Sequence, residues 1–197
     1  MLYSFLKYLF RTVLLLVSKV EVNNLENIPS SGPVLLASNH LSLWDPIVLG
    51  VVIPRKLHFM AKEELFNIFL IGSIIRKVGT FPVKRGSADR NAIKNSVKIL
   101  KEGEVLCIFP EGTRSKTKEL LPFQPGIVLI AEKGDSILIP VGIKGTNKIL
   151  RKGFRPIISI NIGEPIQIKD LIEDKLTSEK MEIISNRIQS KVKELVM

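Results

Sequence analysis

The sequence of 197 residues contains one cysteine and two histidines. A single cysteine excludes an internal disulfide and a thiolate metal cluster, and it suits a reducing compartment. Because Cys107 lies inside the apolar run "EVLCIF", we expect it to be a buried strand residue. His58 in "KLHFMAK" has no second histidine or cysteine to partner it, so we expect a strand histidine and predict no metal site.

Acidic and aromatic residues are also few. Lysine and arginine number 29 against 19 aspartates and glutamates, which leaves a net charge of +10. Such an excess indicates an anionic partner: nucleic acid, an acidic membrane leaflet or a phosphorylated substrate. Aromatic residues make up 6% of the chain, and no motif interleaves them with basic residues, so we do not expect nucleic acid to be the partner.

The sequence lacks the uninterrupted apolar run of about 20 residues that a membrane span requires. The apolar start "MLYSFLKYLFRTVLLLV" is shorter, contains two cations and has no A-x-A cleavage site after it. On a helix its polar residues fall in one narrow stripe: Ser4, Lys7, Arg11 and Ser18. This pattern is typical of a helix lying in a membrane surface with its cations at the headgroups. A helix packed on the protein core fits the periodicity equally well.

Apolar runs alternate with helical patterns through the rest of the chain, which indicates an α/β fold with a mostly parallel sheet flanked by helices. We therefore divide the chain into an N-terminal amphipathic, membrane-contacting helix at 1–22 and a single α/β domain at 23–197. The expected strands are 33–38, 56–62, 79–85, 104–110, 136–145 and 155–166. The expected helices are 45–53, 63–78, 87–103, 127–134 and a C-terminal helix starting at Thr177 or Ser178.

The stretch "VLLASNHLSLWDPIVLG" places His40 at the end of a buried strand, the edge where open α/β sheets build ligand sites. A carboxylate such as Asp45 could fix the tautomer of the imidazole and raise the basicity of its other nitrogen. Such a pair can take a proton from a hydroxyl or thiol during acyl transfer. The spacing alone is explained at least as well by a loop-capping histidine and an aspartate that N-caps the next helix.

A second polar cluster, "FPEGTRS", follows another apolar strand. Gly112 allows a tight turn, and Arg114 offers a fork of donors that matches a phosphate. Glu111 would hold the turn by accepting hydrogen bonds. Lys62 and Arg85 also follow predicted strands. Each cation alone could be a solvated surface residue, but together beside a His/Asp pair they indicate an anion site.

These motifs resemble the glycerolipid acyltransferases. "NHLSLWDP" matches the N-H-x4-D signature of that family, and "AKEELF", "GTFPVKRG", "FPEGTRS" and "IPVGIKGT" are similar to its later segments, in the same order. The resemblance extends from about residue 23 to the region of Pro165 and is strongest to the bacterial 1-acyl-sn-glycerol-3-phosphate (lysophosphatidic acid) acyltransferases. It adds residues that shape the site: Asn39, Gly79, Phe81, Glu111, Gly112, Thr113 and Pro140.

The sequence departs from the family in two places. The family often has F-K-x-G after the third block, whereas this chain reads "FQPG" at 123–126 and lacks that cation. The N-terminal region is short, so the two-helix membrane motif of some relatives is expected to be abbreviated.

The resemblance implies a glycerol-3-phosphate acyltransferase-like fold and transfer of a fatty acyl group from acyl-CoA or acyl carrier protein to the sn-2 hydroxyl of lysophosphatidic acid, without a cofactor or metal. His40 would be the general base, Asp45 would orient it, and the substrate phosphate would be bound by Lys62, Arg85 and Arg114. The enzyme is expected on an anionic membrane surface, at the cytoplasmic face of the cell membrane. The alternatives are another acceptor, such as glycerol 3-phosphate or a different lysolipid, and a non-catalytic protein that binds anionic lipid.

Overall fold

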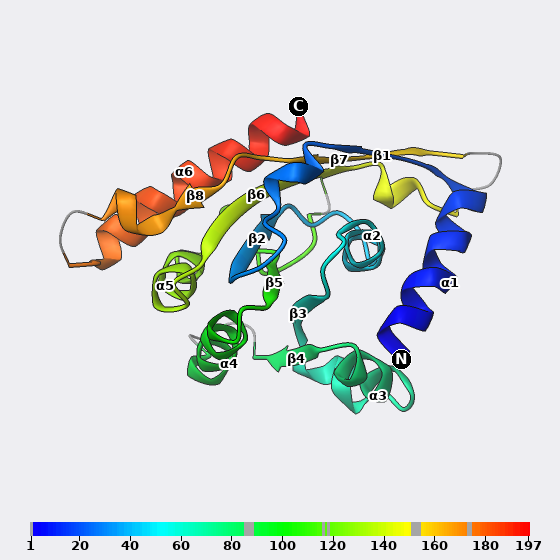
Figure 1. Ribbon diagram of the computed structural model, residues 1–197, viewed down its shortest axis with the longest axis horizontal. Helices are drawn as coiled ribbons and strands as arrows, with labels where there is room; N and C mark the ends of the chain where they lie inside the picture. Colours follow the sequence, from blue (N-terminus) through cyan, green and yellow to red (C-terminus); the bar gives the residue numbers. More distant parts are fainter. Residues whose placement is uncertain (1, 85–88, 116, 118, 151–154, 173–174) are drawn as a thin grey trace.

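The computed structural model describes residues 2–84, 89–115, 117, 119–150, 155–172 and 175–197 (Figure 1). Within them, eight strands form one sheet in the order β1-β7-β6-β2-β5-β3-β4, with β8 beside β6. The strands are β1 (Lys19–Asn23), β2 (Val34–Ser38), β3 (Leu57–Lys62), β4 (Thr80–Val83), β5 (Val105–Ile108), β6 (Ile137–Lys144), β7 (Ile157–Ile162) and β8 (Ile166–Gln167). The α-helices are α1 (Leu2–Val17), α2 (Asp45–Val52), α3 (Ile71–Lys77), α4 (Arg90–Lys101), α5 (Gly126–Lys133) and α6 (Ser178–Val196). Short 3-10 helices are η1 (Leu25–Asn27), η2 (Glu63–Asn67), η3 (Thr146–Lys148) and η4 (Ile168–Leu171).

The centre of the sheet is parallel. β6, β2, β5, β3 and β4 pair in parallel with their neighbours in that series, whereas β7 and β8 run antiparallel to β6. This confirms the predicted mostly parallel α/β fold. Because the carboxyl ends of β2, β5 and β3 meet at one edge, the loops that follow these strands are neighbours.

Both faces of the sheet are covered by helices, as Figure 1 shows. Alternate side chains of β2 point to opposite faces: Val34 and Leu36 pack with α1 and α2, and Leu35 and Ala37 pack with α4, α5 and α6. All residues of β2 and β5 are buried, including Cys107 as predicted. Burial raises the pKa of the Cys107 thiol, which leaves it unreactive.

Two predictions of secondary structure are wrong. The single helix expected at 63–78 is divided into η2 and α3, because Leu70 between them adopts a left-handed φ of 68°. The N-terminal helix ends at Val17, and the expected boundary at residue 22 falls inside the edge strand β1. The alternating burial of β1 over only five residues gives a weak sequence signal beside the longer apolar run.

Helix α1 turns only part of its polar stripe toward the protein: Lys7 is half-buried and Ser18, directly after the helix, is buried, whereas Ser4 and Arg11 are exposed. Lys7 Nζ donates to the Ile53 carbonyl at 2.5 Å, and the Leu57 amide donates to the Tyr3 hydroxyl at 3.0 Å. Burial lowers the pKa of Lys7, and the neighbouring charge of Arg11 lowers it further. The prediction that Lys7 lies at lipid headgroups is therefore wrong.

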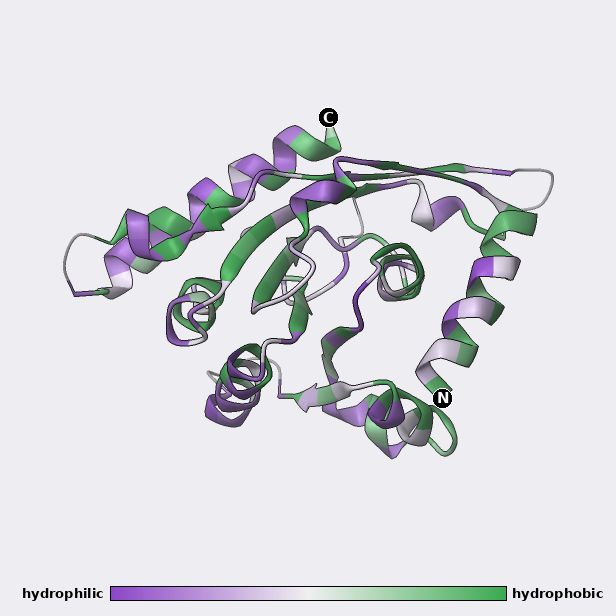
Figure 2. Ribbon diagram, in the orientation of Figure 1, coloured by the Kyte–Doolittle hydropathy of each residue, from purple (hydrophilic) through white to green (hydrophobic). Residues whose placement is uncertain are grey.

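The opposite side of α1 is apolar and exposed (Figure 2). Its large side chains in contact with solvent are Phe5, Tyr8, Leu9, Leu15 and Leu16. Packing against the core explains the apolar residues on only one side of this helix. None of the helices in the described ranges is both long and apolar enough to cross a membrane.

Candidate active site

His40 follows the carboxyl end of β2, and its ring is bound by the side chain of Asp45. His40 Nδ1 lies 2.7 Å from Asp45 Oδ2, and the side chains are 12% and 0% exposed. No described residue hydrogen-bonds to the other ring nitrogen, Nε2. The pair therefore has one nitrogen fixed by a carboxylate and one available to a substrate.

Asp45 is the first residue of α2, and its carboxylate turns back toward the preceding loop. Oδ2 also accepts from the amides of Leu41 and Ser42, at 2.6 and 2.7 Å. Oδ1 accepts from the hydroxyl of Thr146 at 2.5 Å. The carboxylate thus organises the loop that carries His40, whereas the sequence predicts a cap for α2.

Asn39 and Thr146 connect this loop to the end of β6. The Asn39 side chain accepts from the Ile143 amide at 2.8 Å and donates to the Ile143 carbonyl at 2.9 Å. At Gly145, φ is 84°, and a Cβ there would collide with the carbonyl of Ile157. These contacts place Thr146 against Asp45. The sequence interpretation missed Thr146, although a hydroxyl directly after a predicted strand of the parallel sheet was the available signal.

We expect Thr146→Val to lower kcat about tenfold with little change in KM, because a buried acceptor that loses its donor costs about 1–3 kcal/mol. Asp45 Oδ1 would then have no protein donor, and the carboxylate could rotate away from His40. Steady-state kinetics measure this effect. Thr146→Ser restores the hydroxyl and should restore kcat; if it fails to do so, Thr146 acts through packing alone.

Glu111 connects the loop after β5 to the His40 loop. Its Oε1 accepts from the His40 amide at 2.6 Å, and its Oε2 accepts from the Leu121 amide at 3.0 Å. Gly112 follows with φ of 68°, where a glycine is needed for the turn. The Ser115 amide donates to the His40 carbonyl at 3.0 Å, so His40 is held on both sides of its backbone.

Glu111→Gln should destabilise the fold by about 1–3 kcal/mol, because the glutamine NH2 must face one of two backbone N–H groups. Burial raises the pKa of Glu111 above its ordinary value of 4.5, although two amide hydrogen bonds oppose this. The folded state therefore binds the proton more tightly, and the contribution of Glu111 to stability falls as pH rises from 4.5 to the raised pKa. Urea unfolding over this pH range should show that decline in the wild type and not in Glu111→Gln.

Aromatic rings form an apolar wall beside the pair. The Phe109 ring stacks on the His40 ring at 4.1 Å between centroids, and Phe59 continues the stack at 6.3 Å from Phe109. Trp44, adjacent to Asp45, contacts Phe10 of α1 edge to face. The sequence interpretation did not include Phe109 among the site residues, although it begins the "FPEGTRS" segment.

Two of the three predicted phosphate-binding cations, Lys62 and Arg114, belong to the described residues and follow different strands. Arg114 is exposed and directly precedes Ser115, so it lies in the loop bonded to His40. Lys62 ends β3 at the same edge of the sheet, and its Nζ lies 2.9 Å from Glu64 Oε1. Arg85 is outside the described residues. The exposed Thr113 accompanies Arg114 on the loop.

Three residues predicted to shape the site support the sheet. Gly79 precedes β4 at the edge opposite His40, and its carbonyl hydrogen-bonds His58 Nδ1 at 3.0 Å. Phe81 is inside β4 and packs toward the α4 face. Pro140 of β6 pairs with Ala37 of β2 on one side. On the other side of β6, the residues before Pro140 pair with β8 and those after it pair with β7. Pro140 lies between these two pairings, so its missing N–H removes no hydrogen bond between strands.

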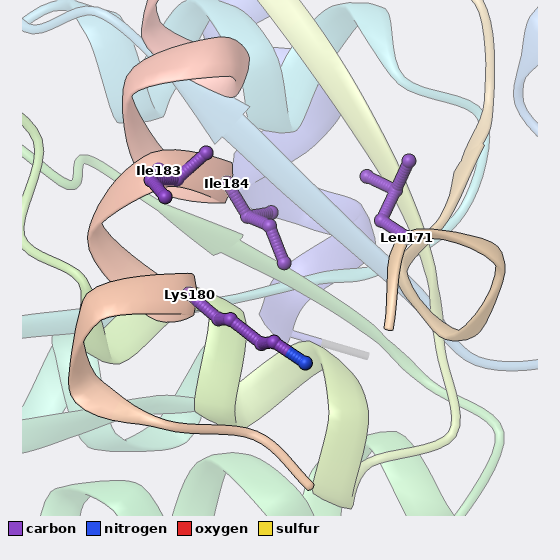
Figure 3. A pocket seen from close by; sticks show the side chains of 4 residues that line it. All are labelled: Leu171, Lys180, Ile183 and Ile184. Carbon is purple, nitrogen blue, oxygen red and sulfur yellow. The ribbon is translucent and has the colours of Figure 1, made fainter. Parts of the chain in front are cut away.

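A surface hollow of about 120 Å³ is unrelated to the His40 site (Figure 3). Its walls are formed by Leu171, Lys180, Ile183 and Ile184. Leu171 belongs to η4, which follows β8, and β8 pairs with the first residues of β6. The hollow therefore lies near the amino ends of the parallel strands, opposite His40.

Comparison with known proteins identifies the family. A family model described as "Acyltransferase" matches residues 19–144. The chain is 35% identical to a 1-acyl-sn-glycerol-3-phosphate acyltransferase of Bacillus subtilis, over 98% of this chain and 96% of that protein. It is 32% identical to the Streptococcus pneumoniae protein of the same name, over 97% and 73%.

Among solved structures, the 1-acyl-sn-glycerophosphate acyltransferase PlsC from Thermotoga maritima superposes with a TM-score of 0.77 at 27% identity, covering 98% of this chain and 79% of that one. The fold, the ordered motifs and these relatives agree: the chain belongs to the acyltransferase family, among the 1-acyl-sn-glycerol-3-phosphate acyltransferases.

Proposed function

We propose that this enzyme transfers a fatty acyl group from a thioester to the sn-2 hydroxyl of 1-acyl-sn-glycerol-3-phosphate, forming phosphatidic acid in phospholipid biosynthesis. The observation that carries this proposal is the His40–Asp45 pair, joined at 2.7 Å with Nε2 left available. Two relatives named for this reaction match the chain over nearly all its length.

The pair acts on the acceptor hydroxyl. His40 Nε2 takes the proton as the oxygen attacks the thioester carbonyl carbon, and Asp45 stabilises the imidazolium that forms. The tetrahedral intermediate then loses the thiolate: the carbon–sulfur bond breaks, and the imidazolium returns the proton to sulfur. The products are the ester and a free thiol, and the reaction requires neither a metal nor a further cofactor.

The oxyanion of the intermediate needs hydrogen-bond donors from outside the 40–42 loop. The amide of His40 donates to Glu111, and the amides of Leu41 and Ser42 donate to Asp45. All three are already engaged. The Ser115 hydroxyl is buried without a partner in the described part of the chain, so it is a polar group that bound substrate could satisfy.

Arg114 directly precedes Ser115, whose amide donates to the His40 carbonyl, so the backbone of Arg114 is held near His40. Its guanidinium would bind the acceptor phosphate, and Lys62, at the end of β3, would add positive charge, as the sequence also predicts for Arg85. A phosphate held there would direct the sn-2 hydroxyl toward His40.

The acyl donor would be acyl-CoA or acyl carrier protein, both of which carry negative charge that suits this basic protein. The enzyme would act as a peripheral protein on the anionic cytoplasmic face of the cell membrane, held by the exposed apolar side of α1.

Acyl-transfer assays with purified protein test the proposal. Acyl-CoA and acyl carrier protein thioesters are each combined with lysophosphatidic acid, glycerol 3-phosphate and lysophosphatidylcholine. We expect phosphatidic acid as the main product. Faster acylation of glycerol 3-phosphate or of the neutral lysolipid would assign a different acceptor, and absence of transfer to all three would refute the enzyme assignment.

We expect Arg114→Ala to raise KM for lysophosphatidic acid about tenfold, because it removes a charge-assisted hydrogen bond to phosphate of about 1.5–3 kcal/mol. Arg187→Ala is the matched control, since Arg187 is an exposed arginine on α6. Titration of the acceptor at saturating donor measures KM. An unchanged KM in Arg114→Ala would place the phosphate elsewhere.

A further inference from the structure

An apolar surface outside the catalytic machinery follows β3 and extends from η2 into the first turn of α3. We define the apolar loop as residues 65–74. Its exposed apolar side chains are Leu65, Ile68, Phe69, Leu70, Ile71 and Ile74. Phe69 is 90% exposed and Leu70 64% exposed. Six neighbouring large apolar groups in contact with water form a patch that soluble surfaces rarely carry without a partner.

The backbone presents this patch in a fixed way. Phe66 is buried beneath the tip, with the Arg76 guanidinium 5.2 Å from its ring centroid. Gly72 packs so closely on the Phe66 carbonyl that a Cβ would collide with it. Leu70 holds φ of 68°, which is unfavourable for a branched side chain. A leucine with a positive φ and an exposed side chain is compatible with a ligand that the tip contacts.

Helix α1 and the turn after α3 both bond to the start of β3. The Tyr3 hydroxyl of α1 accepts from the Leu57 amide, and the carbonyl of Gly79, just beyond α3, hydrogen-bonds to the ring of His58. Leu57 and His58 are consecutive, so α1 and the residue that ends the α3 segment bond to adjacent positions of β3. Figure 2 shows apolar residues on both α1 and α3.

Cations flank both apolar surfaces. Exposed basic residues near them are Arg11 of α1, Lys62 before η2, and Arg76 and Lys77 of α3. The carboxylates of Glu63 and Glu64 in η2 only partly balance them. Apolar side chains bordered by cations fit an anionic bilayer, whose headgroups pair with the cations while its acyl chains receive the apolar groups.

We propose that the apolar loop is a second membrane-binding element, which inserts into an anionic leaflet together with the exposed side of α1. This inference rests on the proposed function, whose acceptor and product are lipids. Two insertion points fix the tilt of the enzyme relative to the membrane plane, whereas a single inserted helix would leave that tilt free. The Phe10–Trp44 contact connects α1 to the residue beside Asp45, so the tilt also sets how the His40 site faces the bilayer.

Vesicle binding tests the proposal without any reaction. Purified wild type, Phe69→Ser and Leu16→Ser are sedimented with vesicles of phosphatidylcholine and phosphatidylglycerol. Each substitution should weaken partitioning about tenfold or more, as expected when a large apolar side chain no longer inserts. Ile183→Ser, at a comparably exposed isoleucine on α6, is the matched control and should bind as the wild type does. Wild-type binding by Phe69→Ser would overturn the proposal.

A fluorescent reporter tests insertion directly. Trp44 is the only tryptophan, so Phe69→Trp in a Trp44→Phe background reports on the loop alone. Its emission should shift to the blue on addition of vesicles and be quenched by brominated acyl chains, whereas Ile183→Trp in the same background should not respond. If Phe69→Trp does not respond, or if Phe69→Ser converts a wild-type dimer to a monomer and leaves vesicle binding intact, the loop is not a membrane element.

The two proposals fail separately. With a short-chain lysophosphatidic acid dispersed as monomers, Phe69→Ser should retain the wild-type rate. Inactivity of the wild type in that assay would refute the proposed function, while the vesicle results would still decide whether the loop binds membranes.

Discussion

Replacement of His40 by alanine should lower kcat/KM for acyl transfer by about 10²–10⁴-fold, the range that a general base contributes. The ring is the one group at the site with a nitrogen facing no protein partner among the described residues and a second nitrogen bound to a carboxylate. Initial rates with lysophosphatidic acid and a saturating thioester measure the loss. Vesicle binding should be unchanged, because the His40 side chain is 12% exposed and is not among the exposed apolar side chains proposed to contact the membrane.

His58→Asn is the matched control for that experiment. Asparagine can place an NH2 where His58 Nδ1 now bonds the Gly79 carbonyl, so the sheet edge is preserved. His58 is the second residue of β3, near the edge of the sheet opposite His40, and activity should therefore be retained. Full activity in a folded His40→Ala variant, checked by circular dichroism, would show that another group removes the proton.

The sequence was sufficient to predict the fold class because hydrophobic runs report burial. The continuous apolar runs around Leu35 and Leu106 become strands covered on both faces, as parallel strands must be. That topology brings the residues after each strand to one edge. The hydrogen bond from the His40 amide to Glu111 joins two of these loops, whereas the sequence predicted only that Glu111 holds its own turn.

Contacts between distant segments could not be predicted, because they depend on register and side-chain direction. The Thr146–Asp45 contact joins residues 101 positions apart in the sequence, and the Asn39–Ile143 contact joins residues 104 positions apart. For α1, the periodicity identified a polar stripe but not the side it would face. Lys7 turns inward because the carbonyls at the end of α2 accept from it. The break in the helix at Leu70 could not be predicted from the sequence either, because leucine normally favours an unbroken helix.

Asp45→Asn should lower kcat at least about hundredfold while leaving the fold intact, since a hydrogen bond to a charged group contributes about 1.5–3 kcal/mol and the charge also stabilises the imidazolium. Three N–H groups converge on Oδ2: those of His40 Nδ1, Leu41 and Ser42. The asparagine oxygen must occupy that position, and its NH2 then faces the Thr146 hydroxyl, which can accept. The tautomer of His40 is thereby kept, and the loss reports the missing negative charge.

Asp45→Ala separates charge from geometry. It removes the acceptor of two backbone amides and of the Thr146 hydroxyl, so we expect a lower free energy of unfolding as well as lost turnover. Urea unfolding should rank wild type and Asp45→Asn close together and Asp45→Ala well below them. Long-range ¹H–¹⁵N spectra of Asp45→Asn should show the proton on Nδ1 of His40, as in the wild type. If Asp45→Asn instead keeps nearly full activity, the carboxylate serves only to shape the loop, and the charge on Asp45 has no part in the proton transfer.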